Sequence, residues 1–314
     1  MVKIDLITGF LGSGKTTFIK RYAKYLIDQG MNIGILENDF GAVNVDMMLL
    51  QDLMGENCEL EMVSGGCDAD CHRRRFKTKL IAMGMCGYDR VIVEPSGIYD
   101  VDEFFDALRE EPLDQWYQIG NVIAIVDAKL EDDLSEEADY LLASEAANAG
   151  KIILSHADEA TEEQIEGTIG HLNRALEQIH CGRRLDQEIV KKSIPELSEA
   201  DFAELSDAGY VSENYRKMDM GEHKGFDSLY FMNLELTAQQ LEQAVRKIMA
   251  SPECGEVFRI KGFQKCEDGK WLQLNATKRG ISIAPIEAGQ EVLIVIGEHL
   301  NEENIRKLLV ATVG

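Results

Sequence analysis

One stretch decides how this chain folds: Gly9-Phe10-Leu11-Gly12-Ser13-Gly14-Lys15-Thr16. It follows an apolar run at 3–8 and precedes an amphipathic stretch at 16–29, so it predicts a tight loop between a strand and a helix. Glycines let backbone N–H groups turn inward, and the helix start adds the positive end of its dipole. The spacing G-x-x-x-x-G-K-[ST] therefore predicts a phosphate-binding loop, with a chance glycine-rich turn as the alternative.

Each polar residue of this loop has a predicted role. Lys15 is placed to reach the β- and γ-phosphates of a nucleoside triphosphate, and the Thr16 hydroxyl to bind Mg²⁺. We expect the nucleotide to contact the end of the loop and the first helical turn, namely Gly12, Ser13, Gly14, Lys15, Thr16 and Thr17.

A second strand end supplies the acid that such a site needs. Glu94-Pro95-Ser96-Gly97 follows an apolar run at 91–93. We expect Glu94 to hold a water of the Mg²⁺ shell and Gly97 to turn an N–H toward the γ-phosphate. The alternative is a solvent-exposed glutamate at a strand end.

Two further acids follow the apolar run at 32–37. Asp39 and Asp46 are candidates for orienting water or Mg²⁺. Together with the loop, they give a candidate catalytic set of Lys15, Asp39 and Glu94.

The segment Ser155-His156-Ala157-Asp158 bears on the choice of base. Guanine-specific proteins often carry Asn-Lys-x-Asp here, because the Asp accepts hydrogen bonds from guanine N1–H and N2–H₂, a donor pair that adenine lacks. Asp158 is present, and His156 can stack on the base in place of Lys. We expect GTP to be bound in preference to ATP. The alternative is that Asp158 caps a helix starting near Thr161.

Short apolar runs separated by helical stretches indicate an α/β fold with a parallel sheet and helices on both faces, as in P-loop NTPases. These strands are expected at 3–8, 32–37, 90–94, 121–126 and 151–155. A polar, acidic stretch follows, and then a small α+β domain with strands near 228–236, 256–263, 270–277, 280–285 and 291–297 and helices at 237–250 and 301–310. The pair Asp268-Gly269 is a predicted hairpin turn. The predicted division is a GTPase-like domain at 1–185, a connecting segment at 186–225 and a C-terminal domain at 226–314.

The charge balance excludes some partners. The chain has 314 residues, with 56 Asp and Glu against 32 Lys and Arg, for a net charge of −24. Such a surface repels DNA, RNA and anionic lipid, so neither nucleic acid nor membrane is an expected partner. No apolar run approaches the ~20 residues of a membrane span, and the N-terminus leads directly into a strand rather than a signal peptide. We interpret the seven cysteines as reduced thiols of a cytoplasmic protein.

Several motifs occur together in one order along the chain. They are the loop at 9–17, Glu37-Asn38-Asp39-Phe40-Gly41 followed by Asp46, Ser64-Gly65-Gly66-Cys67, Glu94-Pro95-Ser96-Gly97 and Val126-Asp127-Ala128. This combination resembles the CobW-like P-loop GTPases, and Phe258-Arg259-Ile260-Lys261-Gly262-Phe263 with Trp271 is similar to that family's C-terminal domain. The resemblance implies a GTPase that delivers or regulates Zn²⁺, Co²⁺ or related metals, or assists cobalamin-linked pathways.

The metal motif departs from the family's Cys-x-Cys-Cys. This chain has Cys67-Asp68-Ala69-Asp70-Cys71, followed by His72. Two thiolates at i and i+4 share a helix face, and with a carboxylate or imidazole they suit Zn²⁺ or Co²⁺. Glu37 matches a family metal-site acid and could complete the set with Cys67 and Cys71. The alternatives are ordinary thiols beside a surface His72, or a disulfide between the two cysteines.

The one basic run of the chain follows this cluster. It comprises His72, Arg73, Arg74 and Arg75 with Lys77 and Lys79. We favour a solvated helix face, with a docking patch for an acidic partner as the alternative.

These observations favour a GTP- and Mg²⁺-binding protein that acts as a metallochaperone or a metal-dependent regulator. Slow hydrolysis is expected, because no certain arginine finger or catalytic glutamine is visible. The expected partners are a guanine nucleotide and a client metalloenzyme or cofactor protein, with a homodimer left open. Two other functions stay open: a regulator of a corrinoid or other cofactor protein that binds no metal itself, and an ATP-using small-molecule kinase.

Overall fold

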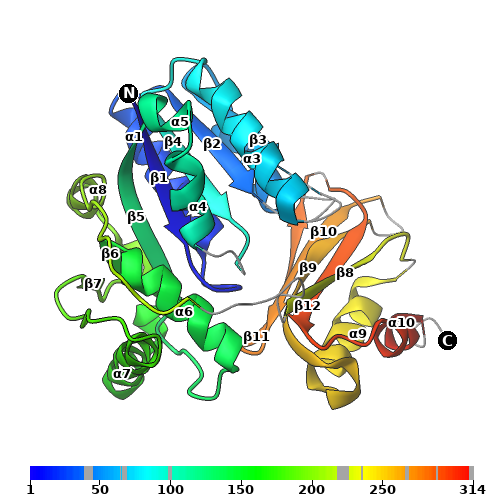
Figure 1. The fold of residues 1–314 in the computed structure, drawn as a ribbon. Coiled ribbons are helices and arrows are strands. Elements are labelled where there is room, and N and C mark those ends of the chain that lie inside the picture. Colours follow the sequence, from blue (N-terminus) through cyan, green and yellow to red (C-terminus); the bar gives the residue numbers. More distant parts are fainter. Residues whose placement is uncertain are drawn as a thin grey trace. The chain divides into compact units, whose positions relative to one another are not determined.

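A computed structural model describes residues 1–38, 45–63, 65, 69–97, 101–217, 226–234, 236–265, 269–287 and 289–310. The contacts within the chain divide it into two units, Met1–Asp219 and Met220–Gly314. Figure 1 shows the strands and helices of each unit.

The first unit is built on a parallel sheet with seven strands in the order β3-β2-β4-β1-β5-β6-β7. The strands are β1 (Val2–Thr8), β2 (Ile33–Asn38), β3 (Cys58–Val63), β4 (Arg90–Pro95), β5 (Tyr117–Asp127), β6 (Lys151–Ser155) and β7 (Ile189–Val190). The predicted fold class is confirmed, and five of these strands match predicted ones. The sequence analysis missed β3 and β7. Strand β3 alternates acidic and apolar residues instead of forming an apolar run, and β7 has only two residues.

Helices cover both faces of this sheet (Figure 1). On one face, α1 and α8 share a core with Ile33, Ile92 and Ile123 of the strands. Helices α3, α4 and α6 lie on the other face (Figure 1). The helical elements are α1 (Lys15–Asp28), α2 (Val45–Leu49), η1 (Gln51–Leu53), α3 (Ala69–Gly84), α4 (Val101–Leu108), α5 (Leu113–Trp116), α6 (Glu136–Asn148), η2 (Ala157–Glu159), α7 (Glu162–Gln178), η3 (Ile194–Glu196) and α8 (Glu199–Leu205).

Much of the predicted connecting segment packs within the first unit. Ile194 and Leu197, in and just after η3, and Phe202 of α8 are buried in the core beneath α1. The Phe202 ring stacks on Tyr22, with 6.4 Å between the ring centroids. Although the apolar periodicity of this stretch is weak, three of its apolar side chains are buried in the core of the first unit.

A buried polar network joins the central strands to the end of α8. Asp5 of β1 accepts hydrogen bonds from the Tyr22 hydroxyl and from Arg90, each at 2.8 Å. Arg90 also donates to the Ser206 carbonyl at 3.1 Å, and the Asn121 backbone N–H donates to Asp5 at 2.9 Å. Asp5 and Arg90 are 0% and 3% exposed, so their ion pair is shielded from water. Burial raises the pKa of Asp5, and the Arg90 guanidinium acts in the opposite direction.

The second unit is an antiparallel sheet in the order β11-β10-β9-β12-β8, and the residues buried by α9 and α10 form its core. Its elements are β8 (Phe226–Phe231), α9 (Ala238–Ala250), η4 (Pro252–Cys254), β9 (Glu256–Lys265), β10 (Trp271–Thr277), β11 (Gly280–Ile286), β12 (Val292–Glu298) and α10 (Glu302–Val310). All the predicted elements of this unit are present. Strands β9 and β10 pair antiparallel, as a hairpin requires, but Asp268 of the predicted turn lies outside the described residues.

In the described part of the chain, no helix has the length and apolar character needed to cross a membrane.

Candidate functional site

The phosphate loop lies between β1 and α1, as its sequence predicts. Gly9, Gly12 and Gly14 have positive φ angles of 148°, 78° and 101°. A Cβ on Gly9 would lie 2.3 Å from the Ile125 carbonyl oxygen, so no larger residue fits there. The buried Lys15 ammonium donates a 2.6 Å hydrogen bond back to the Gly9 carbonyl. The loop is thus closed around the lysine at the start of a helix.

The other loop residues differ in exposure. Ser13 is buried, and its hydroxyl oxygen has no hydrogen-bond partner among the described residues. Gly12, Gly14 and Thr16 are half-buried, whereas Thr17 is exposed. The nucleotide contacts of these loop residues, Thr17 included, stay a prediction.

Glu94 lies beside Thr16 at the end of β4. The Thr16 hydroxyl donates to Glu94 Oε1 at 2.8 Å. Glu94 is 4% exposed, so the alternative of a solvent-exposed glutamate is wrong. Its second oxygen, Oε2, is buried without a hydrogen-bond partner in the described structure. A hydroxyl and an unsatisfied carboxylate oxygen side by side fit the oxygen-ligand chemistry of Mg²⁺.

The charges around Glu94 come from neighbouring elements. Burial raises the pKa of Glu94, and the Asp46 carboxylate on α2 raises it further. Lys15 acts in the opposite direction, as do hydrogen bonds with Thr16 and with Glu37, its neighbour across the β2–β4 ladder. The structure thus places Glu37 and Glu94 side by side at the carboxyl ends of β2 and β4, and the charge of Asp46 on α2 acts on Glu94. Asp39 lies outside the described residues.

Gly97 lies directly against the phosphate loop. A Cβ on Gly97 would come within 2.8–3.0 Å of Leu11 side-chain and backbone atoms. The Ser96 N–H donates to the Asn38 carbonyl at 2.8 Å, which ties this turn to the end of β2. Two motifs that are 80 residues apart in the sequence are therefore adjacent in space.

The candidate base-binding residues follow β5 and β6. Ser155 is next to the loop, because a Cβ on Gly14 would lie 3.8 Å from Ser155 Cβ. His156 has a positive φ of 56°, and its Nδ1 lies 3.5 Å from Asp127 Oδ2. Asp158 is exposed in η2. Thr161 caps α7 through a capping box with Gln164, so the alternative that Asp158 caps this helix is wrong.

The cysteine cluster is only partly described. Cys71 is a half-buried cysteine on α3, and Cys67 lies outside the described residues. Glu37 is 3% exposed at the end of β2. Within the described ranges, no three His, Cys, Asp or Glu side chains are grouped as metal ligands. The transition-metal set predicted for Glu37, Cys67 and Cys71 stays a prediction.

His72 lies inside the first unit and not at its surface. It is 1% exposed, so the alternative of a surface histidine is wrong. Its Nε2 lies 2.8 Å from Asn38 Oδ1, and its Nδ1 lies 3.1 Å from the Gly65 carbonyl. With both ring nitrogens engaged, His72 ties the first turn of α3 to the end of β2, close to Glu37 in the sequence.

The sequence analysis missed a buried carboxyl group under the phosphate loop. Glu145 of α6 is 1% exposed and accepts hydrogen bonds from the Thr8 hydroxyl at 2.9 Å and the Gly9 N–H at 3.2 Å. Its Oε2 is buried without a hydrogen-bond partner among the described residues. The burial of Glu145 could have been inferred from its position as a lone acid among small residues, Ala143-Ser144-Glu145-Ala146-Ala147.

Glu145 predicts a pH dependence of stability. Burial raises its pKa from 4.5 to about 7, against the opposing charge of Lys15. Between these values the unfolded chain ionises and the folded chain does not, so the free energy of unfolding falls as pH rises. The difference of about 2.5 pH units corresponds to about 3 kcal/mol. The stability gained by Glu145→Gln over wild type should therefore grow by about this amount between pH 4.5 and 7.5.

The measurement is urea denaturation of both proteins across this pH range. Glu136→Gln, at an exposed position on the same helix, is the control and should follow the wild-type profile. A stability difference between Glu145→Gln and wild type that does not change with pH would contradict the prediction.

Comparisons with known proteins agree with this geometry. Residues 3–183 match the family described as CobW/HypB/UreG, nucleotide-binding domain, and residues 232–313 match the Cobalamin synthesis protein cobW C-terminal domain. The zinc chaperone YjiA of Escherichia coli is 28% identical over 183 residues, which are 55% of either chain. The zinc-regulated GTPase metalloprotein activator 1 of Schizosaccharomyces pombe is 21% identical over 321 residues, covering 91% of this chain and 77% of that protein.

The crystal structure of Zn(II)-bound YjiA GTPase from E. coli is 20% identical and covers 99% of this chain and 98% of that chain, with a TM-score of 0.38. The chain spans about half the length of the two E. coli zinc chaperones that it matches. Because the first family match covers more than half of the sequence and includes the phosphate loop, Glu94 and Asp158, the chain belongs to the CobW/HypB/UreG family.

Proposed function

We propose that this protein binds GTP with Mg²⁺, hydrolyses it slowly, and acts as a metallochaperone or metal-dependent regulator for a client metalloenzyme or cofactor protein. The contact between Thr16 and Glu94 carries the proposal, because it pairs the loop hydroxyl with a buried acid that has an unsatisfied oxygen. Mg²⁺ held there would offset the charge of the phosphates. Lys15 would contact the β- and γ-phosphates, and Gly97 would donate its N–H near the γ-phosphate.

Guanine is the base that the site favours. Asp158 is exposed after β6 and takes no part in capping α7, so its carboxylate is available to accept from guanine N1–H and N2–H₂. His156 stands where the guanine-specific motif has Lys. Its imidazole beside Asp127 would offer the base a flat surface.

Hydrolysis would use few groups of this chain. Glu94 and Asp39 are the acids proposed to orient the water and Mg²⁺, and Asp46 adds negative charge beside Glu94. We propose slow turnover in the absence of a partner, because the sequence has no certain arginine finger or catalytic glutamine.

A transition metal would be the cargo. Glu37, Cys67 and Cys71 are the proposed ligands, and thiolates favour Zn²⁺ and Co²⁺. The names of the relatives YjiA and YeiR, both zinc chaperones, support this direction. His72 joins the start of α3, which carries Cys71, to the end of β2, which carries Glu37. We further propose a cytoplasmic location, consistent with the free thiols of Cys58, Cys86, Cys181 and Cys254.

The test is metal binding as a function of nucleotide. Co²⁺ is titrated into the protein with GTP, GDP or ATP, and the thiolate charge-transfer absorption is followed. We expect the Co²⁺ affinity of the GTP-bound protein to differ about 5–150-fold from that of the GDP-bound protein. ATP added to the GDP-bound protein should leave its Co²⁺ affinity unchanged. Phosphate release with GTP but not ATP should accompany this difference.

Two variants make the result specific. Cys67→Ser combined with Cys71→Ser should lose the absorption and keep GTP binding, whereas Cys86→Ser, at an exposed free cysteine, should resemble wild type. Equal spectra for wild type and the double variant would remove the cysteine site. GTP binding without any metal would instead support a regulator that has no metal of its own.

A further inference from the structure

The carboxyl group of Glu145 contacts the point at which β1 leads into the phosphate loop. Its Oε1 accepts hydrogen bonds from the Thr8 hydroxyl at 2.9 Å and from the Gly9 N–H at 3.2 Å. The Gly9 carbonyl accepts in turn the 2.6 Å hydrogen bond from the Lys15 ammonium. Gly9 is therefore held by Glu145 through its N–H, and it holds the proposed phosphate-binding lysine through its carbonyl.

The backbone of Gly9 is closely packed. A Cβ at this residue would lie 2.3 Å from the Ile125 carbonyl oxygen and 2.6 Å from the Ser13 hydroxyl oxygen. Because Gly9 has so little room, the acceptor that fixes its N–H also fixes the carbonyl that positions Lys15.

The surroundings of Glu145 favour its neutral form. The side chain is 1% exposed, and Oε2 has no hydrogen-bond partner among the described residues. An ionised carboxylate would leave a charged oxygen there without a donor, whereas the acid can carry its proton on Oε2 and keep Oε1 as the acceptor for both donors. In agreement with this arrangement, burial raises the pKa of Glu145 to about 7.

Lys15 links Glu145 to the nucleotide site by its charge. Its ammonium acts to lower the pKa of Glu145 and also that of Glu94. In the described part of the chain, no other charge on the elements packed against α6 shifts the pKa of Glu145. The buried and half-buried titratable groups on these elements are Asp102, Glu103 and Asp106 on α4, His171 on α7, and Tyr117 and Asp127 on β5.

A bound triphosphate would change the charge balance around Glu145. Its phosphates would offset the positive charge of Lys15 and add negative charge to the same loop, of which Mg²⁺ cancels only a part. Both effects disfavour a carboxylate on Glu145, so they raise its pKa above the value in the free protein. A nucleotide therefore binds most tightly when Glu145 carries its proton.

We propose that Glu145 is a positioning residue of the phosphate loop, which holds Gly9 and through it Lys15 as a neutral carboxylic acid, and which couples nucleotide binding to proton uptake. This inference rests on the proposed function and adds a pH dependence to GTP binding. By linkage, the affinity for GTP is fully present below the pKa of Glu145 in the free protein and falls as pH rises above it.

The test compares GTP binding by wild type and by Glu145→Gln as a function of pH. The amide keeps an oxygen acceptor for Thr8 and Gly9 but cannot ionise. Dissociation constants are measured with a fluorescent, slowly hydrolysed GTP analogue and Mg²⁺. Between about pH 6 and 8, the ratio of the wild-type constant to the Glu145→Gln constant should rise about 10-fold. Titrations of the nucleotide and of groups common to both proteins cancel in this ratio.

Proton uptake gives a second readout that a purely structural role would not change. Calorimetric titrations in two buffers of different ionisation enthalpy count the protons taken up when the nucleotide binds. Near pH 7, wild type should take up about half a proton more per nucleotide than Glu145→Gln.

A third variant tests the hydrogen bonds themselves. Glu145→Ala removes the acceptor of the Thr8 hydroxyl and the Gly9 N–H. At pH 6 it should bind the analogue about 10-fold more weakly than Glu145→Gln, because the buried donors lose their partner and Gly9 is no longer held. Circular dichroism checks that this variant folds, and if it does not, the comparison of Glu145→Gln with wild type decides.

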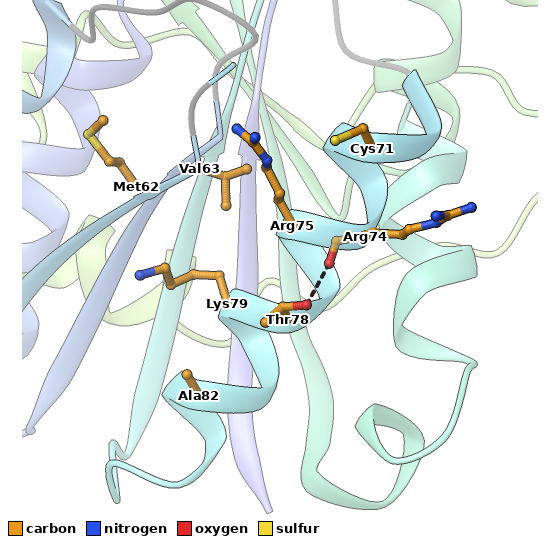
Figure 2. A pocket seen from close by; sticks show the side chains of 8 residues that line it. All are labelled: Met62, Val63, Cys71, Arg74, Arg75, Thr78, Lys79 and Ala82. Atoms are coloured by element: carbon orange, nitrogen blue, oxygen red, sulfur yellow. Dashed lines mark hydrogen bonds between the residues drawn. The ribbon is translucent and has the colours of Figure 1, made fainter. Parts of the chain in front are cut away.

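Two controls remove one carboxylate elsewhere in the first unit. Glu136→Gln changes an exposed position on the same helix as Glu145. Glu61→Gln changes a residue of β3 that pairs at 2.7 Å with Lys79, which lines the pocket between β3 and α3 shown in Figure 2. Both variants should keep the wild-type pH profile and proton uptake.

The possible outcomes separate this inference from the proposed function. A ratio of dissociation constants that does not change with pH, or equal proton uptake by wild type and Glu145→Gln, would overturn the role of Glu145 and leave GTP binding in place. No GTP binding by any of these proteins at any pH would refute the proposed function, and the role of Glu145 with it.

Discussion

Lys15→Ala is expected to lower the affinity for GTP at least about 100-fold while the fold is kept. The Lys15 ammonium is buried in the phosphate loop, 2.6 Å from the Gly9 carbonyl, and is the nearest cation to the proposed phosphate positions. Removing one partner of a buried, hydrogen-bonded charge pair costs about 2–5 kcal/mol, and each 1.4 kcal/mol is tenfold in affinity. The backbone of the loop is set by its glycines, so it should form without the lysine.

The measurement is a titration with a fluorescent GTP analogue, with circular dichroism and thermal unfolding as checks of the fold. Lys20→Ala is the matched control, because Lys20 lies on the same helix and pairs with Asp52 at the surface. It should bind GTP as wild type does. Near wild-type affinity in Lys15→Ala would remove the loop from the proposed mechanism.

Arg90→Met is expected to be the most destabilising single change outside the nucleotide site. It leaves Asp5 buried without its guanidinium partner and deprives the Ser206 carbonyl of a donor. Breaking a buried ion pair in this way costs about 3–5 kcal/mol. Arg174→Met, which breaks an exposed pair with Asp132, should cost less than about 1 kcal/mol.

Because the chain has two units, the unfolding of the first one has to be followed by a probe that lies within it. The chain has two tryptophans, Trp116 in α5 and Trp271 in β10. In a Trp271→Phe background, Trp116 fluorescence during urea denaturation follows the first unit alone. If Arg90→Met and Arg174→Met shift the midpoint equally, the buried network does not have the predicted weight.

The sequence predicts the parts of the fold that local patterns encode. The phosphate loop, the apolar strands and the hairpin-connected second unit follow from short stretches with strong periodicity or glycine spacing. Strand β3 was not predicted, because only some of the side chains of an edge strand have to be buried and its sequence is therefore no continuous apolar run. Its Glu61, for example, pairs with Lys79 of α3. The burial of Ile194 and Phe202 was not predicted, because the residues of α1 that they contact are far away in the sequence.

In the candidate site, too, residues of local motifs could be predicted, whereas residues placed by the packing of distant elements could not. Thr16 and Glu94 each belong to a recognisable motif, and their predicted proximity follows from the rule that parallel strands present their carboxyl ends at one edge. Glu145 belongs to no sequence motif, and His72 stands in the cysteine motif without any sign that it bonds to Asn38; the roles of both depend on helices α6 and α3 packing against the sheet. The spacing of Cys67 and Cys71 indicates soft ligands, but it does not determine which third group completes the set.

The central position of β1 has a consequence for biosynthesis. This strand is synthesised before its partners β4 and β5, and its Asp5 is held by groups as distant as Asn121. Arg90, in the same network, donates to the Ser206 carbonyl, which is synthesised more than a hundred residues later. The nascent chain therefore cannot complete the support of its phosphate loop until α8 has emerged. By the same reasoning, a fragment cut at residue 185 would leave the Phe18 and Tyr22 face of α1 uncovered, whereas one that continues to 217 keeps its cover.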